Sequence, residues 1–197
     1  MKYLKVLLLV LCCTSIVACY RPGAAVAPAS EEEFEQVFSF YYQQPDPQQL
    51  LGALAYLDEP GVFSSNMKAP VMGFLSALAL ERPDDWKVVK DLVFERETSL
   101  NALMQAVPRQ AQSVQKLLAQ PKAIASSAAE LDFLWGAFSA TGDARFVQII
   151  IRTAQNEGDP LVKAAANWSL ASQRKQHPKV EEIFQQSSTQ PDDQSSK

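Results

Sequence analysis

Apolar residues recur at helical spacing through most of the chain. The first clear example has large apolar side chains at positions i, i+3, i+4 and i+7 of one helical face. These residues are Phe34, Val37, Phe38 and Tyr41. Ser30 and Glu33 have the spacing of a capping box, which predicts the start of this helix. Asp46 followed by Pro47 predicts the start of the next one, because a proline has no N–H to lose in a first helical turn.

Prolines divide the rest of the chain into further helical segments. Five of them precede or open a stretch with helical apolar spacing: Pro70, Pro83, Pro108, Pro160 and Pro178. The sequence contains no Asn-Gly or Asp-Gly hairpin turn, and the most strand-like run, residues 88–94, also fits a helical face. We therefore expect nine or ten helices in an all-α fold. Short connections favour stacked antiparallel helical hairpins, forming a short α-solenoid or a compact helical bundle.

The clearest hairpin spans residues 127–157. Ser127 and Glu130 have capping-box spacing, and Gly142 followed by Asp143 predicts a helix end and a new N-cap. The two helices carry apolar stripes at Leu131, Leu134, Trp135 and Phe138, and at Val147, Ile150, Ile151 and Ala154. This segment resembles tetratricopeptide repeats, in which a Gly-Asp turn joins two helices and a proline follows. Trp135 and Trp168, 33 residues apart, are near that family's period. The resemblance implies helical hairpins but no particular binding residues.

The N-terminal segment has the pattern of an export signal. Lys2 and Lys5 precede an almost unbroken apolar run over residues 6–17, which ends in Ala18 and Cys19. An uncleaved transmembrane helix is the alternative, but the run is shorter than the roughly 20 residues that span a bilayer. The segment resembles the type II signal peptides of bacterial lipoproteins, in which the cysteine after the cut receives a diacylglycerol. The resemblance implies that Cys19 carries acyl chains that anchor the protein in a lipid bilayer.

Composition and apolar spacing divide the chain into four parts. We expect a signal peptide over 1–18, a lipidated tether and linker over 19–30, one helical domain over 31–187 and a disordered tail over 188–197. Loss of the signal leaves 16 basic and 22 acidic side chains, a net charge of −6. This charge disfavours nucleic acid as a partner. Tyr20 stands where many lipoproteins of the inner membrane carry Asp, so the resemblance favours the periplasmic face of an outer membrane.

Few residues in the predicted domain are suited to catalysis. His177 is the only histidine, and its position before Pro178 favours a capping or exposed role. Paired acids occur at Asp84 and Asp85, Glu95 and Glu97, Glu181 and Glu182, and Asp192 and Asp193. Favourable contacts with helix ends or a solvated face account for these pairs. With one imidazole, no free thiol after lipidation and no glycine-rich phosphate loop, we expect neither a metal nor a cofactor.

Three aromatic residues fall off the apolar stripes: Phe40, Tyr42 and Phe133. Such residues either are exposed or pack against neighbouring hairpins, and exposed aromatic side chains commonly carry interface energy. We therefore expect a membrane-anchored, non-catalytic scaffold at the cell envelope, which binds an envelope protein through these residues. The alternative is a hydrolase or glycan-modifying enzyme that works with carboxylates alone.

Overall fold

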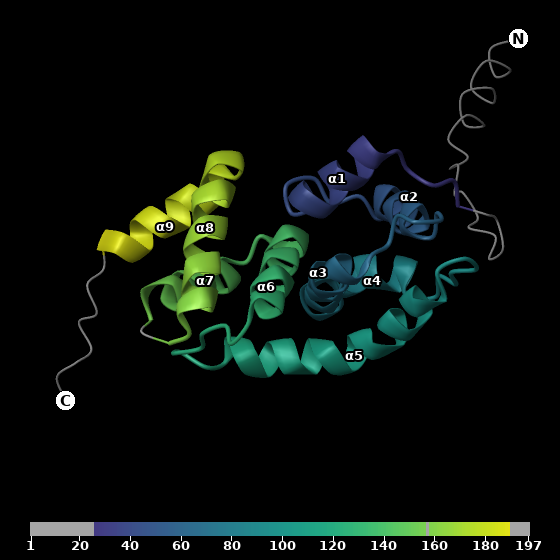
Figure 1. The fold of residues 1–197 in the computed structure, drawn as a ribbon. Coiled ribbons are helices and arrows are strands. Elements are labelled where there is room, and N and C mark those ends of the chain that lie inside the picture. The colour runs from purple at the N-terminus through teal and green to yellow at the C-terminus, as the bar shows by residue number, and fades with distance from the viewer. Residues whose placement is uncertain (1–25, 157, 190–197) are drawn as a thin grey trace, which may run out of the picture.

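The structure, a computed structural model, describes residues 26–156 and 158–189. Within these ranges it contains nine α-helices, one short 3₁₀ turn and no β-strand, which confirms the all-α prediction (Figure 1). The elements are α1 (Glu31–Phe40), α2 (Pro47–Leu57), η1 (Ser65–Met67), α3 (Lys68–Glu81), α4 (Pro83–Val89), α5 (Thr98–Leu118), α6 (Ala128–Thr141), α7 (Ala144–Gln155), α8 (Pro160–Gln176) and α9 (Pro178–Thr189).

Polar side chains at the helix starts form the caps that the sequence predicts. The Ser30 backbone N–H donates to the Glu33 carboxylate at 2.8 Å, and the Ser30 hydroxyl accepts from the Glu33 N–H in return. Asp46 caps α2 by accepting the Gln48 N–H at 2.8 Å. Each such bond satisfies a backbone donor that the first helical turn leaves free.

Pro108 does not open a helix, as its sequence context predicted, but lies inside α5. A proline has no N–H, so the Met104 carbonyl loses its usual helical partner. The helix continues because its apolar face stays packed on both sides of this point, where Met104, Val107 and Ala111 are buried. Burial of this face outweighs one lost hydrogen bond. Figure 1 shows α5 bending along its length.

Helices α3 and α6 form the centre of the described structure (Figure 1). Helices α1 and α2 form a hairpin on one side of this pair, and α5 runs along the other side in contact with α3. Helices α7, α8 and α9 pack on one another next to α6. A regular solenoid brings only consecutive hairpins together. Here α1 and α3 both contact the distant α6, so the helices form a compact bundle.

Two glycines allow α3 and α6 to cross in backbone contact. A Cβ atom built on Gly73 would lie 2.7 Å from the Phe133 carbonyl carbon, in overlap with the carbonyl oxygen. A Cβ atom on Gly136 would meet the Pro70 carbonyl in the same way, 2.8 Å from its carbon. Because each glycine lies against the backbone of the opposite helix, no side chain separates the two helices at this crossing.

The hairpin predicted at residues 127–157 is formed by α6 and α7. Gly142 ends α6 with a φ of 68°, and Asp143 caps α7 by accepting the Arg145 N–H at 2.9 Å. Trp135 in α6 is half-buried, whereas Trp168 in α8 is 76% exposed. The two tryptophans therefore occupy different environments.

The ends of the predicted domain differ slightly from the observed helices. Helix α1 begins at Glu31, as expected, but α9 extends to Thr189, so the first two residues of the predicted tail are helical. The predicted signal peptide, Cys19 and the remainder of the tail lie outside the described residues. None of the described helices combines the length and apolar character that crossing a membrane requires.

Candidate functional site

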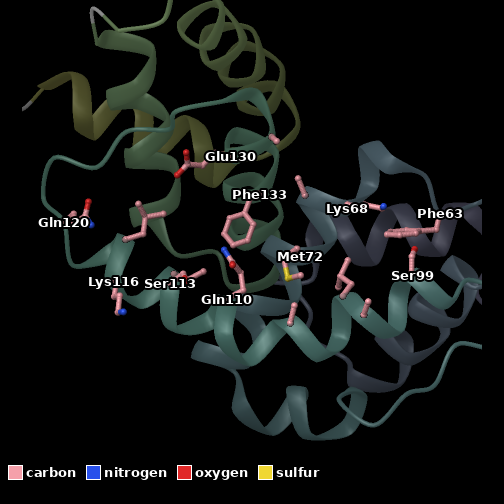
Figure 2. Close-up of a pocket in the computed structure, with 17 residues that line it drawn as sticks. Phe63, Lys68, Met72, Ser99, Gln110, Ser113, Lys116, Gln120, Glu130 and Phe133 are labelled. Atoms are coloured by element: carbon pink, nitrogen blue, oxygen red, sulfur yellow. The ribbon is translucent and has the colours of Figure 1, made fainter.

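A long groove lies between α5 and the central helix pair (Figure 2). Its volume is about 930 Å³, and most of its lining is apolar or carries small polar groups. Lining residues stretch along α5 from Ser99 to Leu117, and Gln120 follows just after the helix. At a rise of about 1.5 Å per helical residue, the part of the groove along α5 is about 27 Å long. This length and its open side suit a segment of polypeptide.

Helix α5 lines the groove with residues at helical spacing. Small or polar side chains recur three to four positions apart along this face, and Leu117 follows them at the same spacing: Ser99, Ala102, Ala106, Gln110 and Ser113. Next to them, Leu100, Met104 and Val107 are buried. Because the buried face holds α5 on the bundle, the adjacent face of small residues leaves room for the groove.

The opposite wall comes from α3, α6 and the loop before η1. Its largest side chains are Phe63, Met72 and Phe133, which Figure 2 shows along the groove. Met72 and Phe133 belong to the two helices that cross at Gly73 and Gly136. The close crossing therefore fixes the floor of the groove.

Side chains from other elements hold both ends of α5. Before the helix, the Asp58 carboxylate accepts the backbone N–H groups of Glu95, Arg96 and Glu97 at 3.1, 3.0 and 2.7 Å. After the helix, two α7 side chains hold the following loop. Arg152 donates to the Ala123 carbonyl at 3.0 Å, and the Thr153 hydroxyl accepts the Ala125 N–H at 2.8 Å.

The charges of the groove are unevenly distributed. Lys68 lies at the end near Phe63, and Lys116 lies toward the other end (Figure 2). Among the described residues, neither lysine forms an ion pair. Glu130 is the acidic residue of the lining, and its carboxylate accepts both the N–H and the hydroxyl of Ser126 at 2.8 and 2.7 Å. Within the described part of the chain, the groove therefore has two cations without an ion pair and one engaged carboxylate.

Of the three aromatic residues predicted to bind a partner, only Phe133 lines this groove. Phe40 and Tyr42 are half-buried and pack against His177 instead. The Phe40 ring stacks on the imidazole at a centroid distance of 4.5 Å, and the Tyr42 ring lies 5.0 Å from Phe138. These two aromatic residues therefore pack between helices, which is one of the two possibilities that their sequence positions left open.

His177 is buried rather than exposed, with 3% of its surface accessible. Its Nδ1 atom lies 3.3 Å from the Tyr42 hydroxyl, and its carbonyl accepts the Val180 N–H at the start of α9. The predicted capping position is therefore correct, but the predicted exposure is wrong. Burial lowers the pKa of the His177 imidazole below its ordinary value, because the charged form loses its hydration.

Three of the four predicted acid pairs lie within the described residues, and each contains a carboxylate engaged in a structural interaction. Asp85 pairs with Arg82 at 2.6 Å, and Glu181 pairs with Arg174 at 2.5 Å. Glu97 caps α5. The fourth pair, in the tail, is outside the described residues. These interactions agree with the structural explanation of the pairs.

Glu81 and Asp143 form an acid cluster that sequence spacing did not group. Arg145 joins them, since its guanidinium lies 2.7 Å from Glu81 and 2.5 Å from Asp143. Burial and the neighbouring Asp143 raise the pKa of Glu81. Burial alone would raise the pKa of Asp143, but its hydrogen bonds with Arg145 lower it. The cluster ties the end of α3 to the start of α7 and lies outside the groove lining.

Helix α8 carries a second exposed apolar surface, in which Leu161 is 80% and Trp168 76% accessible. It belongs to a helix face and not to the groove lining. Across the described part of the chain, no cluster of three or more histidine, cysteine or acidic side chains has the geometry of a metal site.

The α5 face of the groove was not predicted from the sequence. Its signal is present in the chain: residues 98–118 contain a lysine and an arginine but no acidic residue, in a protein whose net charge is −4. The same stretch alternates a large apolar face with one of alanine, serine and glutamine. Comparisons of the chain with protein-family models, curated proteins and solved structures gave no match.

Proposed function

We propose that this protein is a lipid-anchored, non-catalytic scaffold of the bacterial cell envelope that binds a partner protein in the groove along α5. The groove is the observation that carries the binding function, because its length and largely apolar lining suit a polypeptide segment. The N-terminal resemblance supports an anchor at Cys19 and a place at the periplasmic face of an outer membrane.

The chemistry of the lining supports binding more than acid catalysis. A hydrolase working by carboxylates needs an acid positioned toward the substrate. Glu130 is the carboxylate of this lining, and it accepts two hydrogen bonds from Ser126, just before α6. Phe133 and Met72 offer apolar contact area in the middle of the groove, where a bound segment would be most desolvated.

Photo-crosslinking in membranes of cells that make the full-length protein tests this proposal. A benzoylphenylalanine at Ser113, an exposed residue of the groove lining, should form a discrete adduct with one partner protein. The same residue at Gln112, which is exposed on α5 outside the groove lining, should not. Identical adducts from both positions, or none from Ser113, would contradict binding in the groove.

A blocking substitution gives a second measurement. Ala106→Trp should fill the groove and reduce adduct formation from a crosslinker placed at Ser113, whereas Gln112→Trp should leave it unchanged. Both residues are exposed positions of the same helix, so a general effect on α5 would appear in both variants. Circular dichroism of the two proteins checks that their helix content is equal.

A further inference from the structure

We infer that the groove along α5 recognises an extended peptide segment with apolar side chains in its middle and a carboxylate near each end. The inference rests on the proposed function and names the chemistry of the partner. Three features of the groove carry it: the charges at its ends, the polar groups along its wall and its length.

Charge complementarity points to an acidic partner. Lys68 and Lys116 lie toward opposite ends of the groove, and neither is engaged in an ion pair within the described chain. Glu130 is held by Ser126, and α5 contributes no acidic side chain. Two exposed cations that flank an apolar floor would each gain a partner from a carboxylate of the bound segment.

The polar residues of the wall favour an extended segment over a helix. Gln110 and Gln120 face the groove, and no hydrogen bond occupies their amides within the described residues (Figure 2). The Ser113 hydroxyl has only a long 3.4 Å bond to a carbonyl in its own helix. A helical partner satisfies its own backbone, whereas an extended one presents free N–H and C=O groups that glutamine and serine side chains can bind.

The spacing of the lysines sets the length of the segment. Lys68 lies at the same end as Ser99 in Figure 2, and Ser99 and Lys116 belong to one helix. Their separation along that helix is about 26 Å, from a rise of about 1.5 Å per residue. An extended chain covers about 3.3 Å per residue, so about eight residues join the two ends.

The remaining segments of this chain fit the groove poorly. Residues 190–197 include Asp192 and Asp193 but no large apolar residue. The N-terminal apolar run follows directly on Lys2 and Lys5, which would repel the groove lysines. The occupant is therefore a segment of another protein.

Fluorescence anisotropy with two labelled octapeptides tests the inference on the full-length protein in phosphatidylcholine nanodiscs. Both peptides alternate leucine or valine with threonine, and one has aspartate and the other lysine at both ends. The acidic peptide should bind about tenfold more tightly, and added salt should reduce this preference. The double variant Lys68→Glu/Lys116→Glu should reverse it.

A matched double variant on α8, Lys163→Glu/Lys175→Glu, should retain the wild-type preference. Failure of both peptides to bind at about 1 mM, equal affinities, or a preference that the groove variant leaves unchanged would overturn the inference. Such results would leave the proposed function standing if the Ser113 crosslink still forms. Loss of that crosslink is the separate result that contradicts the scaffold itself.

Discussion

Gly73 and Gly136 are the residues on which the centre of the bundle depends most directly. Both lie inside helices, where glycine is less favourable than alanine by about 1 kcal/mol. Because glycine has no Cβ atom, each of these two residues can lie against the backbone of the opposite helix. Isolated glycines in a sequence carry no sign of such an approach, because it depends on which two helices meet. This contact could therefore not be predicted from the chain.

Replacing Gly136 should destabilise the protein severely. In Gly136→Ala the new methyl group would overlap the Pro70 carbonyl, which is backbone and cannot rotate away. We expect the free energy of unfolding to fall by about 3 kcal/mol or more, measured by urea denaturation followed by circular dichroism. Gly52→Ala in α2 is the control, since its nearest contact would be an ordinary 3.4 Å. Equal stability of the two variants would refute the close crossing.

His177 shows how an isolated polar residue is misjudged from sequence. Pro178 predicts that His177 lies between two helices. The aromatic side chains that cover the imidazole are Phe40 in α1, Tyr42 just after α1 and Phe138 in α6. Since their proximity is a tertiary contact, neighbouring residues in the chain gave no indication of burial. Burial disfavours the charged form of the ring, and this links its protonation to stability.

The pKa of His177 predicts a pH dependence of folding. Because its folded pKa is lowered from about 6.5, the unfolded chain takes up a proton first as the pH falls. The free energy of unfolding should therefore decrease below about pH 6.5, by at most about 1.4 kcal/mol per pH unit, until the folded pKa is reached. Urea denaturation at pH 7.5 and 5.5 should show this loss in the wild type. A His177→Gln variant with the same loss would exclude this residue as its source.

At the scale of the helices, the helix starts could be predicted from the sequence because capping depends on local hydrogen bonds. Ser30, Asp46, Ser127 and Asp143 cap the helices they were expected to cap, because an N-cap depends on residues only a few positions away. Pro108 was misplaced for the opposite reason. A proline marks a helix end only if the packing of the helix cannot compensate for the lost bond, and the buried face of α5 compensates here.

At the scale of the whole molecule, the all-α fold class could be predicted from the sequence, but the groove could not. The groove exists because α5 lies on α3 while α6 stands beside it, an arrangement of helices separated in sequence. Of the three aromatic residues predicted to contact a partner, Phe133 lines the groove, whereas Phe40 and Tyr42 do not. A position off the apolar stripe indicates that a side chain does not pack within its own hairpin. It does not indicate whether that side chain is exposed to solvent or packs against another helix.

The anchor is tested by metabolic labelling with a fatty acid. Wild-type protein should incorporate labelled palmitate, whereas Cys19→Ser should lose the label and either retain its signal peptide or lose membrane association. Cys13→Ser removes a cysteine of the apolar run and should keep both properties. Equal labelling of the Cys19 variant and the wild type would remove the lipoprotein interpretation.

The fixation of α5 at both ends limits how this protein can change in length. Asp58 holds the segment before the helix, and Arg152 and Thr153 hold the loop after it. One inserted residue inside α5 would turn everything beyond it by about 100° about the helix axis. Leu117 and Ser113 would then leave the groove while the held ends stayed in place. Substitutions on the outer face are compatible with this architecture, but a change in the number of α5 residues is not.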